Sequence, residues 1–366
     1  MYKSFEIKNF RCFNDFKVEK LKRINLFAGK NDVGKTSLLE ALFIHSGAYN
    51  ANHAITVNTL RGFTQFEIHS IQKESPLNLL FKDFNTDRSI EFVSTNDEQK
   101  KRKSTFSLVN NPEELNHFIT TFFENKQQTD SVLTTIDISQ LFKLIDEETD
   151  EINVSKKKRS ISHYLLLNSK GISQLPTISP PFETIFFPAK GYLSFLDESN
   201  RFGKVVTLKK KDQLIKALQI IEPSIKDIEL SNYSGLPLIS VDVGLDQLIP
   251  ISVMGQGLSR MLSFVLGMMN AENGVILIDE IENGIYHENL PMMWRFLVKI
   301  AESMNIQIFA TTHSLECINS AFQGIPNNKI SSFNYVRLDR KDSLITPTYY
   351  NKESFDSTLA LGLDVR

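Results

Sequence analysis

The sequence has few cysteines, little net charge and no long hydrophobic run. Its 366 residues include two cysteines, Cys12 and Cys317, which lie far apart and match no zinc-binding spacing. We therefore expect no disulfide framework and a reducing environment. The formal net charge of −2 excludes a global attraction to nucleic acid, so such contacts would need local patches.

No segment is typical of a secretory leader or a membrane span. The N-terminus begins with strand-like alternation over residues 1–7 and lacks the apolar core of a leader. The longest apolar run, near residues 264–269, is too short to cross a bilayer. We expect a cytoplasmic protein without a membrane partner, large enough for one large domain or two ordinary ones.

Residues 29–36 read Gly-Lys-Asn-Asp-Val-Gly-Lys-Thr, a complete G-x-x-x-x-G-K-[ST] phosphate loop. An apolar run at 24–28, typical of a strand, precedes it, and a helical pattern from 35 to about 45 follows. We expect ATP to bind here, with Lys35 reaching its β and γ phosphates and the Thr36 hydroxyl ligating Mg²⁺. The candidate nucleotide-binding residues of the loop are Gly29, Asn31, Gly34, Lys35, Thr36 and Ser37.

Two carboxylates follow a second apolar run, Val-Ile-Leu-Ile at 275–278. A buried parallel strand would place Asp279 and Glu280 at the carboxyl edge of the sheet, beside the phosphate loop. Asp279 would hold Mg²⁺, and Glu280 would orient or deprotonate the attacking water.

A histidine, His313, follows the next apolar run at 306–310. A helix over 291–303 would connect this strand to the previous one as a crossover. His313 could then donate a hydrogen bond to the γ phosphate, although a lone histidine at a strand end is also a common structural residue.

The middle of the chain carries weaker signals. Alternating segments from 63 to 109 indicate antiparallel strands, with a charged turn at 96–103. From 111 to about 150 the apolar spacing predicts helix, and 146–159 is typical of an exposed loop or hairpin tip. The basic runs at 100–103, 156–159 and 209–211 could contact a phosphate backbone, or could simply form solvated surface.

The order of these motifs resembles the ABC-type ATPase heads of the RecF, SMC and Rad50 class. The phosphate loop is followed by a glycine-containing segment at 254–260, then by Asp279-Glu280, then by His313. Within the class, Phe-Arg-Cys-Phe at 10–13 and Ala-Thr-Thr-His-Ser at 310–314 look most like the overcoming-lysogenisation-defect (OLD) family, as does Asp-Glu-Ile-Glu-Asn-Gly from Asp279.

The resemblance implies an α/β fold: an ABC-type ATPase head with a mostly parallel P-loop sheet, an N-terminal antiparallel β subdomain and an inserted helical region. It covers residues 1 to about 50 and 185 to 320 well. One ATPase domain would span 1–366, with a nucleotide-binding core at 1–60 plus 185–366 and a β-rich and helical insertion at 61–184.

The resemblance also implies a head-to-head homodimer, or a higher oligomer, with two ATP molecules between the subunits. Gly255 and Gly257 would contact the γ phosphate bound by the other protomer, unless they only cap a helix. Met254 and Gln256 stand where the family usually has Ser and Gly. Two further polar residues, Glu282 and His287, would line the interface or begin a helix.

Three functions follow from these motifs. The first is an ATP-hydrolysing switch that controls a separate effector, a nuclease or toxin, in phage defence. OLD-family nucleases add a Toprim domain with an Asp-x-Asp pair, which the residues after His313 lack, so we expect no nuclease activity from this chain. The second is a DNA-repair or recombination clamp of the RecF type, with nucleic acid as partner. The third, a transporter subunit, is disfavoured because an intact Leu-Ser-Gly-Gly-Gln signature is missing.

Overall fold

The computed structural model describes residues 1–48, 50–63, 75–124, 140–150, 159–168, 171–175, 182–189 and 194–366. A six-stranded core sheet has the strand order β16-β15-β3-β14-β13-β9. All its neighbours pair in parallel except β15 and β16. The strands are β3 (Ile24–Ala28), β9 (Thr184–Phe187), β13 (Val275–Ile278), β14 (Gln307–Thr311), β15 (Phe333–Lys341) and β16 (Leu344–Tyr350). The predicted mostly parallel P-loop sheet is confirmed.

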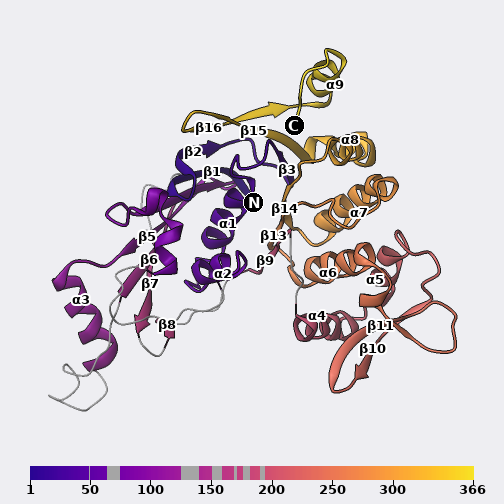
Figure 1. Cartoon of the computed structure of the whole chain (residues 1–366), viewed down its shortest axis with the longest axis horizontal. Coiled ribbons are helices and arrows are strands. Elements are labelled where there is room, and N and C mark those ends of the chain that lie inside the picture. The colour runs from indigo at the N-terminus through magenta and orange to yellow at the C-terminus, as the bar shows by residue number, and fades with distance from the viewer. Residues whose placement is uncertain are drawn as a thin grey trace.

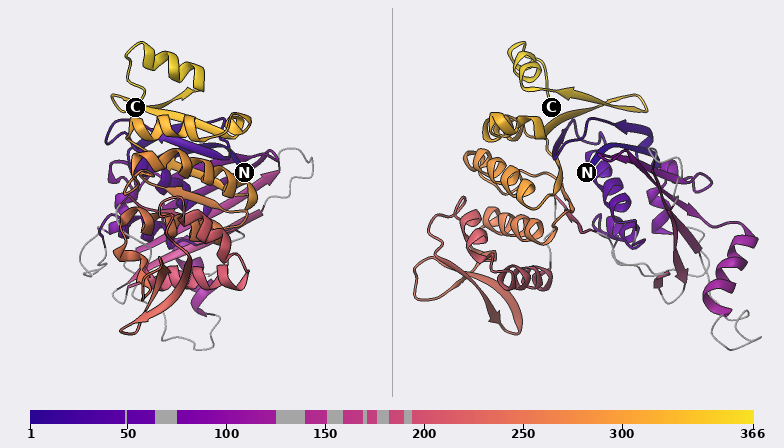
Figure 2. Two further views of the ribbon diagram at one scale, coloured as in Figure 1. Left: turned by 90° about the vertical axis from the view of Figure 1, so that its right-hand side faces the viewer. Right: turned by 180° about the vertical axis from the view of Figure 1, so that it is seen from behind.

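Helices cover both faces of this sheet (Figures 1 and 2). One face packs against α6 (Gln256–Asn270), α7 (Leu290–Ser303) and α8 (Leu315–Gly324), and the other against α1 (Lys35–Ser46) with α2 (His53–Thr59) nearby. Alternate strand residues supply the two cores: Ile308 and Ala310 of β14 join the first and Phe309 joins the second. Double-sided burial explains the continuous apolar runs in the sequence.

A seven-stranded antiparallel sheet lies on the α1 side, in the order β2-β1-β4-β5-β6-β7-β8 (Figure 1). Its strands are β1 (Tyr2–Phe10), β2 (Phe13–Val18), β4 (Ile90–Asn96), β5 (Lys100–Leu108), β6 (Gln140–Asp150), β7 (Arg159–Asn168) and β8 (Gly171–Leu175). The expected antiparallel pairing is confirmed. The sheet combines strands from both predicted parts of the chain, and the division at residues 60 and 184 stays a prediction.

The helix predicted from 111 to about 150 is wrong over its last part. A helix, α3 (Pro112–Ile119), continues into a π-helical turn at Thr120–Glu124, but 140–150 is the strand β6 between β5 and β7. Phe142, Leu144 and Asp146 alternate inward along β6, which is a period of two rather than the helical period.

The charged segments also differ from expectation. The turn predicted at 96–103 is shorter, because β5 already begins at Lys100. Asp146 is only 5% exposed and forms an ion pair with Arg102, so the start of the predicted loop at 146–159 is a buried strand position instead. Residues 151–158, with most of the basic run at 156–159, lie outside the described residues.

A lobe that no sequence motif predicted precedes α6. It contains α4 (Phe195–Thr207) and α5 (Lys211–Leu218), and a small sheet of β10 (Asp227–Tyr233), β11 (Leu236–Asp242) and β12 (Ile249–Pro250). At the other end of the molecule, α9 (Lys352–Ala360) follows β16 (Figure 1). Among the described residues, no helix combines the length and the apolar character needed to cross a lipid bilayer.

Candidate nucleotide-binding site

The core sheet brings the predicted motifs to one edge. The phosphate loop connects β3 to α1, Asp279 directly follows β13, and His313 follows β14. Because β3, β14 and β13 are parallel neighbours, their carboxyl ends meet at the same edge of the sheet. The order of the motifs along the chain does not determine which strands are adjacent in the sheet, and the observed pairing of β14 with both β3 and β13 does.

The loop backbone requires glycine at two positions. Gly29 has a φ of 144° and Gly34 a φ of 102°, a region that residues with a side chain rarely adopt. A Cβ on Gly29 would lie 2.6 Å from the Leu338 carbonyl oxygen, and one on Gly34 would lie 2.7 Å from Cys12 Sγ. Both glycines are therefore needed for the tight curl that directs backbone N–H groups toward one anion.

A cavity of about 750 Å³ opens beside this loop. The predicted residues among its lining are Asn31, Gly34, Lys35, Thr36, Ser37, Asp279 and Glu280. Gly29 belongs to the same loop without lining the cavity. The structure therefore brings the loop and the paired acids together, while their roles in binding stay predictions.

Thr36 and Asp279 form the candidate metal position. The Thr36 hydroxyl donates to Asp279 Oδ2 at 2.9 Å, and the Thr311 hydroxyl donates to Oδ1 at 2.5 Å. Burial raises the pKa of Asp279, which the two hydroxyl donors oppose. One hydroxyl and one carboxylate, completed by phosphate oxygens and water, fit the oxygen ligands of Mg²⁺. Bound there, Mg²⁺ would neutralise charge on the β and γ phosphates.

Lys35 lies folded against its own loop. Its ammonium donates to the carbonyl oxygens of Gly29 at 2.7 Å and Lys30 at 3.0 Å. Burial lowers the pKa of Lys35, whereas the carboxylates of Asp279 and Glu280 favour its charged form. The cation thus stands at the loop that would surround the phosphates.

Glu280 has a strained backbone that neighbouring groups hold. Its φ of 48° is left-handed, a conformation that costs a non-glycine residue on the order of 1 kcal/mol. Its N–H donates to Thr311 Oγ1 at 2.9 Å, and the Asn283 side-chain amide donates to Glu280 Oε2 at 2.6 Å. The carboxylate is fixed but remains 37% exposed, so water can reach it.

His313 lies beside two carboxylates. Its Nδ1 is 3.3 Å from Glu282 Oε1 and 3.7 Å from Glu280 Oε1. Glu282 also accepts the His313 backbone N–H at 3.2 Å and the Thr312 hydroxyl at 2.8 Å. Glu282 therefore orients the His313 segment through these bonds. The imidazole is half-exposed and lies beside Glu280 without lining the cavity, so its contact with a nucleotide stays a prediction.

The glycine-containing segment begins α6 and lies outside this cavity. Gly255, with a φ of 124°, precedes the first residue of the helix. A Cβ on Gly257 would lie 2.5 Å from the Gly284 carbonyl oxygen, so the start of α6 packs tightly against the turn that follows Glu280. Neither Gly255 nor Gly257 lines the cavity at the phosphate loop of its own chain.

Sequence reasoning missed Arg260, which connects α6 to the paired acids. Its guanidinium donates through Nη2 to the carbonyl oxygens of Asp279 at 2.8 Å and Glu280 at 3.0 Å, and through Nη1 to that of Pro188 at 3.3 Å. The side chain is 8% exposed and lies over the Phe264 ring. The available signal was an arginine as the one charged residue in the mostly apolar stretch at 258–269.

A second missed group surrounds Glu40 of α1. Its carboxylate is 1% exposed and pairs with Arg61 Nε at 2.5 Å and Arg11 Nε at 3.3 Å. Arg61 also donates to Ser37 Oγ at 3.4 Å, and both arginines line the cavity. A charged residue inside the apolar pattern of 38–44 was the signal for this group.

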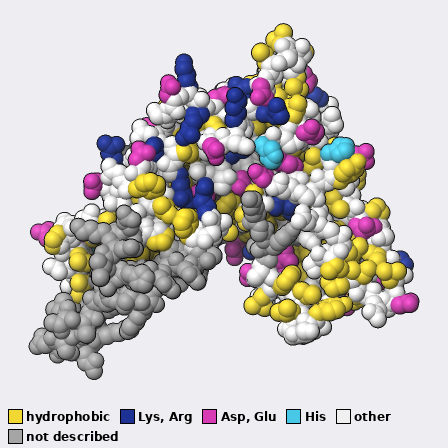
Figure 3. Space-filling model, viewed as in Figure 1, with side chains coloured by type: hydrophobic (Ala, Val, Ile, Leu, Met, Phe, Trp, Pro, Cys, Tyr) yellow, Lys and Arg dark blue, Asp and Glu magenta, His cyan; other side chains and the backbone are white. Residues whose placement is uncertain are grey.

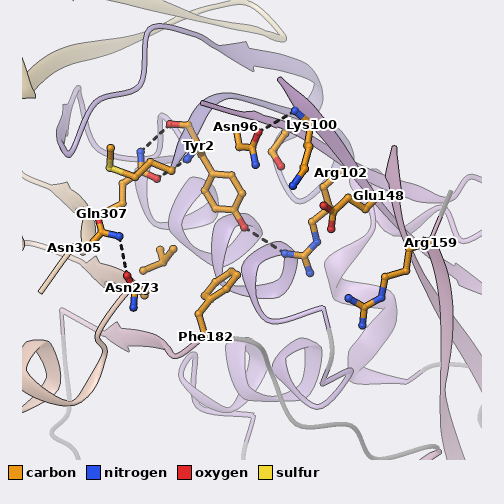
Figure 4. A pocket seen from close by; sticks show the side chains of 14 residues that line it. Tyr2, Asn96, Lys100, Arg102, Glu148, Arg159, Phe182, Asn273, Asn305 and Gln307 are labelled. Atoms are coloured by element: carbon orange, nitrogen blue, oxygen red, sulfur yellow. Dashed lines mark hydrogen bonds between the residues drawn. The ribbon is translucent and has the colours of Figure 1, made fainter. Parts of the chain in front are cut away.

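A separate cavity of about 360 Å³ lies at the opposite, amino ends of β13 and β14 (Figure 4). There Gln307 accepts the Tyr2 N–H at 2.8 Å and donates to the Tyr2 carbonyl at 2.8 Å. Arg102, paired with Asp146, donates to the Tyr2 hydroxyl at 3.4 Å. The Gln307–Tyr2 bonds join the two large sheets, and no residue that lines this cavity also lines the cavity at the phosphate loop.

Comparisons with known proteins show which family the chain matches. Residues 1–318 match the family model of the AAA ATPase domain. An ATP/GTP phosphatase of Helicobacter pylori is 24% identical over 368 residues, which cover 96% of each chain. The uncharacterized protein MJECL11 of Methanocaldococcus jannaschii is 32% identical over 122 residues, 31% of this chain and 99% of that protein.

Among solved structures, an SMC head bound to the C-winged helix domain of ScpA aligns with 97% of this chain and 99% of its own, at 13% identity and a TM-score of 0.48. The family model spans most of the sequence, including the phosphate loop and the paired acids. The chain therefore belongs to the AAA ATPase domain family.

Proposed function

We propose that this protein is a Mg²⁺-dependent ATP-hydrolysing switch. The observation that carries the proposal is the convergence of Lys35, Thr36, Asp279, Glu280 and His313 at one sheet edge. Lys35 and Thr36 would hold the triphosphate with its metal, Glu280 would take the proton of the attacking water, and His313 would contact the γ phosphate. The similarity to an ATP/GTP phosphatase supports triphosphate hydrolysis.

The switch would act as a head-to-head homodimer, with ATP bound between two protomers. The start of α6 does not line the cavity of its own chain, and it would meet the nucleotide of a second one. Val253 precedes Gly255 and Tyr286 follows Gly284, and these residues are 72% and 60% exposed, so a second protomer would cover them. ATP would close this interface and hydrolysis would open it.

The further assignment is an OLD-like, cytoplasmic ATPase that controls a separate nuclease or toxin in phage defence. Its support is the residue pattern around the paired acids and His313. The RecF-type alternative has weaker support, because three of the four cations of the run at 100–103 have carboxylate partners: Lys100 with Glu98, Arg102 with Asp146 and Lys103 with Glu91. Such pairing leaves little charge for a DNA backbone.

The dimer can be tested with a hydrolysis-deficient variant. Glu280→Gln should form a dimer with ATP and Mg²⁺ in light scattering and remain a monomer without nucleotide. Adding Val253→Glu should prevent dimerisation while ATP still binds. Leu208→Glu is a matched control on an exposed apolar residue that follows α4 and lies beside Met269 and Asn270 at the other end of α6, and it should leave dimerisation intact. A Glu280→Gln protein that binds ATP and stays monomeric would contradict the proposal.

A further inference from the structure

An apolar groove of about 520 Å³ runs between α5 and α7, remote from the phosphate loop. Its floor consists of Ile220 after α5, Met269 of α6, and Met292, Phe296 and Ile300 of α7. Met292 is 47% exposed. Hydrophobic side chains gather on the part of the face in Figure 3 that carries α4 to α7, β10 and β11. Methionine-rich floors adapt well to a helix that packs into them.

The rim of the groove is basic. Lys216 of α5 and Arg295 and Lys299 of α7 line it, and no acidic side chain does. Within the described part of the chain, no carboxylate forms an ion pair with any of the three. Arg295 and Lys299 are also four residues apart on one helix, where like charges cost a few tenths of a kcal/mol. A partner with acidic groups would remove that repulsion.

We propose that this groove docks an acidic amphipathic helix of a separate protein. The occupant's apolar stripe would cover Met292 and Phe296, and its flanking carboxylates would meet the three cations. The apolar floor favours a protein over nucleic acid, whose backbone would leave Met292 and Phe296 uncovered. The inference rests on the proposed function in one respect: it identifies the bound protein with the effector that the ATPase controls.

The helices that form the groove also reach the nucleotide site. α6 begins at the glycine-containing segment and carries Met269 near its other end, and α7 leads from the paired acids of β13 to β14. Arg260 connects α6 to the paired acids by donating hydrogen bonds to the carbonyl groups of Asp279 and Glu280. A helix docked across α5 and α7 would therefore contact the elements that opening and closing of the dimer would move.

The test uses the full chain and a fluorescein-labelled synthetic 18-residue helix with leucines along one face and glutamates elsewhere. We expect saturable binding in fluorescence anisotropy, weakened at least about tenfold by Arg295→Glu with Lys299→Glu and also weakened by Met292→Ser. Lys204→Glu, a single charge reversal at an exposed position of α4, is the control and should bind as the wild type does. Circular dichroism verifies that each variant is folded, and ATP turnover without peptide should not change.

Four outcomes would overturn the groove as a docking site for an acidic helix. The peptide could show no saturable binding, or a peptide with lysine in place of glutamate could bind equally well. Lys204→Glu could weaken peptide binding as much as the groove variants do, or a 20-nucleotide DNA could bind and lose its affinity in the same groove variants. Self-association lost in the Arg295 and Lys299 double variant would assign the groove to a second copy and also overturn it. Peptide binding by a chain that hydrolyses no ATP would support the docking site and overturn the proposed function.

Discussion

Arg260 offers a sharp test because one side chain joins α6 to both acids of the site. Replacement by methionine keeps an unbranched apolar stem but removes donors to three carbonyl oxygens, at 2.8, 3.0 and 3.3 Å. A hydrogen bond from a charged group contributes about 1.5–3 kcal/mol, and desolvation of the buried cation offsets part of it. We expect a loss of about 2–4 kcal/mol in the free energy of unfolding.

Turnover should fall more than ATP affinity. Without Arg260, the left-handed backbone of Glu280 loses its carbonyl contact, and a displacement of about 1 Å at a reacting group can cost about 100-fold in rate. Lys35 and Thr36 are untouched, so the Kd for ATP should stay within about threefold, since neither phosphate contact depends on Arg260. Arg260→Lys should recover little, because lysine has one nitrogen on a shorter side chain where the guanidinium uses two nitrogens, Nη2 for Asp279 and Glu280 and Nη1 for Pro188.

The assays are urea denaturation monitored by circular dichroism, calorimetric ATP binding and steady-state phosphate release. Arg88→Met, at an exposed arginine that does not line the cavity, is the control and should change none of these quantities. A folded Arg260→Met protein with wild-type turnover would refute the argument that this residue positions Glu280. Equal losses of affinity and turnover would point instead to general damage of the cavity.

Three further predictions follow. Lys35→Ala should abolish ATP binding in calorimetry, because it removes the ammonium that the loop carbonyls hold where the phosphates would bind. Persistent binding would place the nucleotide elsewhere. Gly34→Ala should weaken ATP binding at least tenfold, since its Cβ would meet Cys12 Sγ in a backbone that disfavours alanine; wild-type affinity would contradict the required curl. Burial lowers the pKa of His53 to about 4, below its value in the unfolded chain. The free energy of unfolding that the neutral imidazole contributes is therefore complete above pH 6.5 and falls by roughly 3 kcal/mol as the pH drops to 4. In urea titrations His53→Gln should flatten this pH dependence, and an unchanged slope would show that His53 is not its source.

Residues with strong local requirements were predictable from the sequence. The phosphate loop needs glycine at two positions, and a doubly buried parallel strand needs an unbroken apolar run, so β3, β13 and β14 were located within a residue or two of their observed bounds. The crossover helix α7 followed from the same reasoning. Their adjacency then placed Lys35, Asp279 and His313 at one edge.

Other features depend on tertiary contacts that a single sequence does not display. The segment of β6 carries apolar residues whose spacing fits a short helix as well as a strand, and its pairing with β5 and β7 decides the outcome. The role of Arg260 arises only because α6 packs against the turn after β13. Glu40 became interpretable once Arg61 and Arg11 were seen beside it.

The central claim, that Glu280 acts on water at a triphosphate held by the phosphate loop, is tested most directly by single-turnover ATP hydrolysis in the Glu280→Gln variant. The amide preserves the size of the side chain and the contact with Asn283 but cannot accept a proton. We predict that ATP still binds with wild-type affinity while the rate falls by about two to four orders of magnitude. Hydrolysis at the wild-type rate with ATP bound would contradict the account.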